Sequence, residues 1–124
     1  MKKILIVDDD RDLSDLTQTV LKQAGYEVIV SHDSLSGIDM AKKQKPNLIL
    51  MDVMLPGMNG AEVVKSLKAD AILKDIPVIF LTALLSEADK HNTDGICVDN
   101  KNYTAIAKPY EIKNLLEKVK RILG

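Results

Sequence analysis

The sequence lacks several features that stabilise or localise other classes of protein. It has one cysteine, Cys97, so it can form neither an internal disulfide nor a zinc site built from several cysteines. No apolar stretch reaches the roughly 18 residues that a membrane-spanning helix needs. Only four apolar residues separate Met1-Lys2-Lys3 from the first aspartate, too few for a signal peptide. We therefore expect a cytoplasmic protein that does not contact membranes.

Excess charge of one sign and glycine-rich loops are also missing. Seventeen basic and 18 acidic residues give a net charge of -1, which argues against direct, sequence-independent nucleic-acid binding. Neither a dinucleotide fingerprint nor a Walker-type phosphate loop can be drawn. The length of 124 residues fits one domain, and no linker, repeat or low-complexity segment divides it. The chain is thus predicted to be a single domain over residues 1–124.

Short apolar runs alternate with stretches of helical spacing. The runs expected to form strands are Ile4–Val7, Val28–Val30, Leu48–Met51, Val78–Leu81 and the weaker Ala105–Ala107. Five rounds of alternation predict an α/β fold with a parallel sheet and helices on both faces. Right-handed crossovers restrict this sheet to a doubly wound form.

The apolar spacing also predicts the helices. The first should follow Asp10 as its cap and end at Gly25, with an inward face of Leu13, Leu16, Val20, Leu21 and Ala24. The second should use Ser34 as its cap and bury Leu35, Ile38 and Ala41. Further helices should begin near Gly60 and before Ile112. A fourth helix that begins at Ser86 should be short. Residues 86–102 should be the most mobile part of the domain, because this stretch offers almost no apolar face.

Polar residues follow the predicted strands at their carboxyl ends. Asp8 and Asp9 follow the first strand, Asp52 the third, Thr82 the fourth and Lys108 the fifth. Open α/β sheets place their ligand sites at this edge. Two carboxylates about 4 Å apart repel by roughly 4 kcal/mol at an effective dielectric near 20, so the cluster needs cations. Mg²⁺ and the lysine would supply them, and a carboxylate can accept a phosphoryl group.

Each of these residues alone has an ordinary structural explanation. An aspartate after a strand is often a helix cap or a turn residue, and a lysine before proline is usually solvated. Their joint position at one sheet edge favours the chemical interpretation. His32 and His91 have no partner at metal-ligand spacing, so we expect both at the surface.

The motifs at these strand ends resemble the receiver domain of two-component response regulators, the CheY-like family. They are Ile4-Leu-Ile-Val-Asp8-Asp9-Asp10, Met51-Asp52-Val-Met-Leu-Pro56-Gly57-Met-Asn-Gly60, Phe80-Leu-Thr82-Ala83 and Ala107-Lys108-Pro109. The resemblance extends from end to end of the chain. It implies a flavodoxin-like, five-stranded parallel sheet of order 2-1-3-4-5.

The resemblance also implies a phosphoacceptor and a metal site. Asp52 would take a phosphoryl group from a phosphohistidine on a sensor histidine kinase or phosphotransfer protein, and would lose it slowly by hydrolysis. Asp8, Asp9, Asp52 and the backbone carbonyl of Met54 would bind Mg²⁺ or Mn²⁺. Such a domain catalyses its own phosphorylation without being a conventional turnover enzyme.

Three further residues receive roles from the resemblance. Lys108, the hydroxyl of Thr82 and the backbone N–H of Ala83 would contact the phosphoryl group. Phosphorylation would then change the surface of helix 4, strand 5 and helix 5, which a downstream protein target would recognise. The sequence identifies neither the kinase nor that target, nor the oligomeric state, nor whether this is a stand-alone protein or one domain of a longer regulator.

Two departures from the family pattern leave alternatives open. Family members usually carry an aromatic residue three positions before the lysine, where this chain has Ala105, with Tyr103 two residues earlier. The segment from Thr82 to Lys108 is also several residues longer than usual. A pseudo-receiver that works without phosphorylation is therefore one alternative. A Mg²⁺-dependent aspartyl phosphatase is another, although residues 8–12 lack the Thr or Val that haloacid-dehalogenase-like enzymes need.

Overall fold

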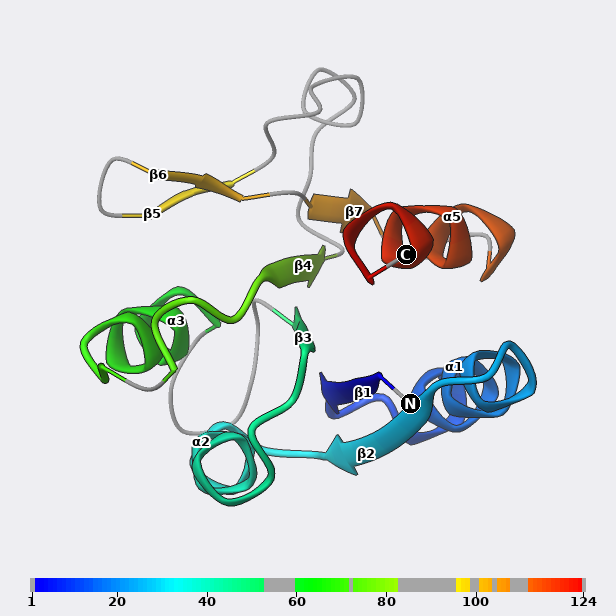
Figure 1. Cartoon of the computed structure of the whole chain (residues 1–124), viewed down its shortest axis with the longest axis horizontal. Coiled ribbons are helices and arrows are strands. Elements are labelled where there is room, and N and C mark those ends of the chain that lie inside the picture. The colour runs from blue at the N-terminus through cyan, green and yellow to red at the C-terminus, as the bar shows by residue number, and fades with distance from the viewer. Residues whose placement is uncertain are drawn as a thin grey trace.

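The computed structural model contains a five-stranded parallel sheet, as the alternating pattern predicts. The structure describes residues 2–52, 60–71, 73–82, 96–98, 101–103, 105–107 and 112–123. The strands pair in the order β2-β1-β3-β4-β7, which corresponds to the expected 2-1-3-4-5 (Figure 1). Their bounds are β1 Lys3–Val7, β2 Glu27–Ser31, β3 Leu48–Asp52, β4 Val78–Thr82 and β7 Ala105–Ala107.

Helices cover both faces of this sheet. In Figure 1, α1 (Arg11–Gln23) and α5 (Ile112–Leu123) lie on one side of the strands, and α2 (Ser34–Gln44) and α3 (Gly60–Lys68) lie on the other. The doubly wound arrangement is thereby confirmed. Because each helix follows a strand in the same sense, α1 and α2 begin at the edge where β1 and β2 end.

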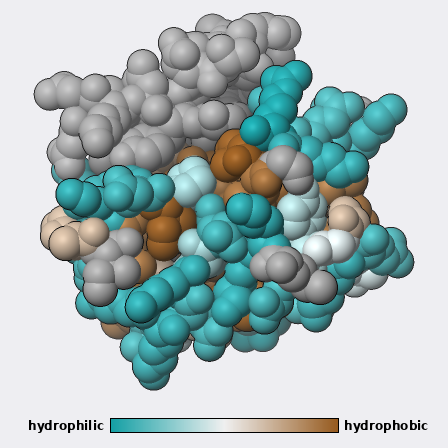
Figure 2. Space-filling view, in the orientation of Figure 1, coloured by the Kyte–Doolittle hydropathy of each residue, from teal (hydrophilic) through white to brown (hydrophobic). Residues whose placement is uncertain are grey.

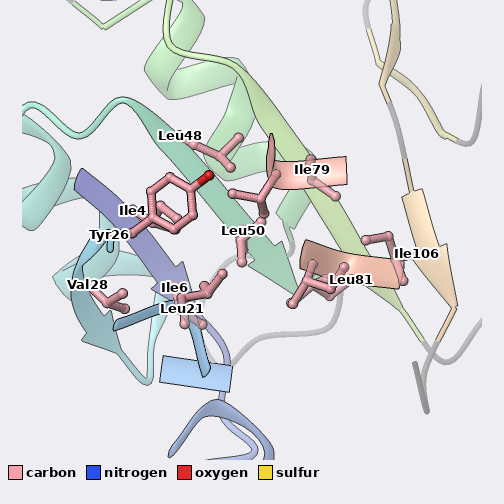
Figure 3. Packing of buried hydrophobic residues seen from close by; sticks show 12 residues of the cluster. Ile4, Ile6, Leu21, Tyr26, Val28, Leu48, Leu50, Ile79, Leu81 and Ile106 are labelled. Atoms are coloured by element: carbon pink, nitrogen blue, oxygen red, sulfur yellow. The ribbon is translucent and has the colours of Figure 1, made fainter. Parts of the chain in front are cut away.

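The sheet separates two hydrophobic cores. On the side of α1 and α5, Ile4, Ile6, Leu48 and Leu50 pack with Leu115 of α5, and Figure 3 shows the strand residues of this cluster. The alternate strand residues form the second core with α2 and α3. All five residues of β3 are buried, as expected for a central strand covered on both faces.

The predicted inward face of α1 is partly wrong. Its fully buried positions are Ser14, Thr17 and Leu21, whereas Leu16 is 54% exposed. The two hydroxyls can be buried because each donates within the helix, from Ser14 Oγ to the Arg11 carbonyl at 3.1 Å and from Thr17 Oγ1 to the Leu13 carbonyl at 2.8 Å. Two small, internally bonded side chains therefore share the buried face of α1 with Leu21, where the spacing predicts bulky apolar residues throughout.

The predictions for α2 need two corrections. Asp33, not Ser34, is the N-cap, and Leu35 is 68% exposed instead of buried. The buried positions are Ser34, Gly37 and Ala41, which are all small. A Cβ at Gly37 would lie 2.9 Å from the methyl groups of Val7. The helix thus approaches β1 so closely that small residues must form its contact face.

Other helix predictions are confirmed. Asp10 caps α1, with its Oδ1 accepting from the N–H of Leu13 at 3.0 Å. Gly25 ends that helix with φ of 100°, a conformation that favours glycine. Leu115 and Val119 of α5 are fully buried, as their spacing predicts.

Residues 96–103 contain strands that the apolar runs do not predict. Strand β5 (Ile96–Val98) pairs antiparallel with β6 (Lys101–Tyr103) in a separate two-stranded sheet. Tyr103 therefore belongs to this small sheet and not to the strand that contains Ala105. The helix expected from Ser86 lies outside the described residues. Polar residues follow the short apolar run Ile96–Val98, and strands of only three residues leave little periodic signal.

The described helices include no candidate for a membrane span. The longest of them, α1, has 13 residues. Polar side chains cover much of the face seen in Figure 2, with smaller hydrophobic areas between them.

Core and surface leucines should differ sharply in their contribution to stability. Leu50 is fully buried, so Leu50→Ala should lower the free energy of unfolding by about 2–5 kcal/mol. The matched change at exposed Leu35 should stay within about 0.5 kcal/mol. Urea unfolding followed by circular dichroism measures both values. Equal losses at the two positions would contradict the packing described here.

The cap of α2 should depend on pH in a defined direction. The Ser36 N–H donates to Asp33 Oδ1 at 2.8 Å and the Ser36 hydroxyl donates to Oδ2 at 3.0 Å. The backbone bond first, and then the hydroxyl bond, lower the pKa of Asp33 below its ordinary 3.8. The cap's stabilisation is therefore present above that value and is lost as the pH falls through the lowered pKa. Ser36→Ala should raise the pKa of Asp33, which NMR titration can measure; an unchanged pKa would count against the cap geometry.

Candidate functional site

Three carboxylates meet where β1 and β3 end. The two strands are parallel neighbours with Val7 opposite Met51, so the next residues, Asp8 and Asp52, continue the same register. Carboxylate oxygens of Asp8, Asp9 and Asp52 all lie within 4.8 Å of one another. The structure thus brings together the three acidic residues that the sequence placed at this edge.

The three acids differ in their exposure to solvent. Asp8 is fully buried and Asp52 is 6% exposed, whereas Asp9 is exposed. Like charges at such a separation repel by about 3 kcal/mol per pair at an effective dielectric near 20, and by less where water reaches the pair. Two of the carboxylates, those of Asp8 and Asp52, are therefore buried, and that of Asp9 lies at the solvent boundary.

Asp8 is fixed from several directions. Its N–H donates to the Ser31 carbonyl of β2 at 3.0 Å, and its Oδ1 accepts from the N–H of Asp10 at 2.9 Å. Its own carbonyl oxygen lies 2.9 Å from Nδ1 of His32. Backbone and side chain are thus both held, which sets the direction of the carboxylate beyond the end of β1.

His32 makes a contact at this edge that sequence reasoning missed. It was expected at the surface, but its ring is half-buried and bonded to the backbone of Asp8. The available signal is its position directly after β2, at the same carboxyl edge as the acidic residues. Metal-ligand spacing between side chains does not reveal the contact, because this histidine bonds to a backbone atom.

The remaining candidate residues are placed only in part. Thr82 is the last residue of β4, with Ala107 of β7 opposite it and Leu81 opposite Asp52. The backbone of β4 thus ends beside the acidic cluster. Met54, Ala83 and Lys108 lie outside the described residues.

The donor set of the cluster fits Mg²⁺. All three side chains offer carboxylate oxygens, the hard ligands that this ion takes. Mg²⁺ usually binds few protein carboxylates and keeps several waters, and exposed Asp9 leaves one side of the cluster open to water. Sulfur and imidazole ligands, which softer metals prefer, are not among the three grouped residues.

The model of the response regulator receiver domain family matches residues 4–120. The chain belongs to this family. Its acidic cluster of Asp8, Asp9 and Asp52 is of the kind that receiver domains use for Mg²⁺.

Similar proteins differ in their total length. The chain is 36% identical over 124 residues to the polar-differentiation response regulator DivK of Brucella anthropi, covering 99% of this chain and 97% of that protein. It is 37% identical to the DNA-binding dual master transcriptional regulator RpaA of Synechocystis, covering 99% of this chain but 49% of that protein. The chain thus spans about half the length of RpaA.

A solved structure supports the same fold. A putative response regulator from Chloroflexus aurantiacus superposes with a TM-score of 0.82 at 30% identity, covering 98% of this chain and 97% of that one. The parallel sheet and its flanking helices are therefore those of a CheY-like receiver.

Removing one charge from the cluster should stabilise the metal-free domain. We expect Asp9→Asn to raise the free energy of unfolding by about 1 kcal/mol in the presence of EDTA, because repulsion is relieved at a partly screened position. Asp12→Asn is the control: Asp12 lies in the first turn of α1, where a negative charge is favourable, so this change should slightly destabilise. Urea unfolding measures both. Stabilisation of the same size by both changes would argue against local repulsion.

Proposed function

We propose that residues 1–124 act as a single phosphoacceptor receiver domain of a two-component system. Asp52 accepts a phosphoryl group from the phosphohistidine of a sensor histidine kinase or phosphotransfer protein, with Mg²⁺ or Mn²⁺ as cofactor. The observation that carries this proposal is the clustering of Asp8, Asp9 and Asp52 at the carboxyl edge of the sheet.

The choice of Asp52 as the acceptor rests on its place in the sheet. Strand β3 is central, with β1 on one side and β4 on the other, so residues from both neighbours end beside Asp52. Asp8 is less suited, because it is fully buried at the end of β1, one strand further from β4, whereas Asp52 is 6% exposed. An oxygen of Asp52 would form a bond to phosphorus while the phosphorus–nitrogen bond breaks, and the leaving imidazole would take up a proton.

The other residues of the site would bind the metal ion, which neutralises negative charge. Asp8, Asp9 and Asp52, with the Met54 backbone carbonyl, would hold the metal. When bound, the ion supplies positive charge against the carboxylates and the phosphoryl oxygens.

Residues at the ends of the other strands would complete the contacts to the phosphoryl group. Lys108, directly after β7, would contribute a second positive charge. The hydroxyl of Thr82 and the N–H of Ala83, at the end of β4, would donate hydrogen bonds to the phosphoryl oxygens.

The consequence of phosphorylation is a change in protein contacts. Added negative charge at Asp52 would draw Thr82 and Lys108 inward and alter the surface around β7 and α5, which a downstream protein recognises. We place this domain in the cytoplasm, as a switch that works by binding proteins and does not itself contact DNA or membranes. Its net charge of -1 fits this role, because nucleic-acid binding usually needs a cationic surface.

The proposal predicts stoichiometric phosphorylation of one residue. With acetyl phosphate and Mg²⁺, the wild-type protein should gain the mass of one phosphoryl group, and Asp52→Asn should gain none. EDTA should prevent the gain, because the phosphoryl oxygens and three carboxylates would then repel. Intact-mass spectrometry makes the measurement, with Asp12→Asn as a control that should be modified like wild type.

Other results would identify the competing functions. Absence of any Asp52-dependent gain would reject phosphoacceptor function and favour a phosphorylation-independent interaction module. Rapid multiple-turnover release of inorganic phosphate from a small phosphomonoester would instead favour an aspartyl phosphatase.

A further inference from the structure

His32 forms a hydrogen bond beyond the end of the sheet. The regular pairing of β1 with β2 ends at Val7 and Ser31, and the Asp8 N–H adds one more backbone bond to Ser31. The half-buried ring of His32 then reaches back to the Asp8 carbonyl oxygen, with Nδ1 at 2.9 Å. A carbonyl oxygen can only accept, so Nδ1 must carry the hydrogen of this bond.

The accepting oxygen belongs to the peptide unit that joins Asp8 to Asp9. That unit is planar, so its carbonyl cannot turn without also turning the N–H of Asp9 and the chain direction on both sides. With the Asp8 N–H held by Ser31 and the Asp8 carbonyl held by His32, both peptide units that flank the Asp8 Cα are anchored to the end of β2. The backbone that carries Asp8 and Asp9 is thus held by residues at the end of the neighbouring strand, β2.

This anchoring acts against the repulsion in the cluster. Three carboxylates within 4.8 Å of one another favour any rotation that separates them, and exposed Asp9 has the most room to move. The hydrogen bond from His32 to the Asp8 carbonyl restricts that rotation. It does so without adding a further side chain to the three carboxylates that would bind the metal. Ligands held in place before binding lose less freedom when the cation arrives.

We propose that His32 is a positioning residue for the acidic site, holding the Asp8–Asp9 peptide so that both carboxylates stay directed at a common cation. The proposal rests on the proposed function, since it takes Mg²⁺ to be that cation. His32 itself contacts neither the cation nor the phosphoryl group.

Two substitutions separate the hydrogen bond from the bulk of the side chain. His32→Leu keeps a branched side chain of similar reach but removes the donor. His32→Asn keeps an N–H donor at the same number of bonds from the backbone as Nδ1. We expect His32→Leu to weaken Mg²⁺ binding roughly threefold to tenfold, the range that corresponds to one neutral hydrogen bond, and His32→Asn to stay within about twofold of wild type.

Calorimetric Mg²⁺ titration and the Mg²⁺ dependence of acetyl phosphate modification provide two readouts. The half-saturating Mg²⁺ concentration should rise in His32→Leu, while the modification rate at saturating Mg²⁺ stays near that of wild type, because the acceptor is unchanged. Ser36→Ala, which weakens the cap of neighbouring α2, is the control and should leave Mg²⁺ affinity unchanged. Equal weakening by Ser36→Ala and His32→Leu would overturn the proposal, as would an Asn variant as impaired as the Leu variant.

A metal-free measurement keeps this inference separate from the proposed function. Amide hydrogen exchange of Asp8 and Asp9 in EDTA should be at least roughly threefold faster in His32→Leu than in wild type, and unchanged in His32→Asn. Unchanged exchange in the Leu variant would reject the positioning role even if Mg²⁺ binds. Failure of the wild-type protein to bind Mg²⁺ would instead reject the proposed function, and exchange would still decide whether His32 holds the peptide.

Discussion

Because β1 pairs in parallel with β3, Asp8 and Asp52 lie side by side at the carboxyl edge of the sheet, although two carboxylates repel each other. The two hydrophobic cores hold this arrangement in place, because shifting either strand by one residue would turn its buried side chains to the opposite face of the sheet. The free energy of packing thus maintains an unfavourable cluster of carboxylates. A cation bound at such a cluster would relieve the repulsion between the carboxylates.

The helices that begin at the same edge moderate the negative charge. Asp10 and Asp33 cap α1 and α2, so their carboxylates are bonded to helix N–H groups. The amino ends of helices carry partial positive charge, which favours acidic groups nearby. Acidic residues at this edge therefore have two separate tasks. Some stabilise the helix ends, and three remain together as a candidate cation site.

Much of this architecture was predictable from sequence, and the errors have physical causes. Continuous apolar runs identified the strands because central parallel strands are buried on both faces. The inward faces of α1 and α2 were assigned wrongly, because apolar spacing assumes that bulky residues face the core. Here the helices approach the sheet through Ser14, Thr17 and Gly37, whose burial depends on internal hydrogen bonds and on space beside Val7. The three acids were found from their strand-end positions, but the backbone contact of His32 leaves no spacing signal.

The connection between β4 and β7 has a consequence for divergence among related domains. Thr82 and Ala107 are opposite each other in register, yet a long segment that includes β5 and β6 joins their strands. The entropic free-energy cost of closing a flexible loop grows only with the logarithm of the loop length. Each doubling of the length adds about 0.6 kcal/mol. Insertions in this segment can therefore accumulate at small thermodynamic cost while the strand ends keep their alignment. Such a domain can acquire new binding specificity in the connection without altering the chemistry at the sheet edge.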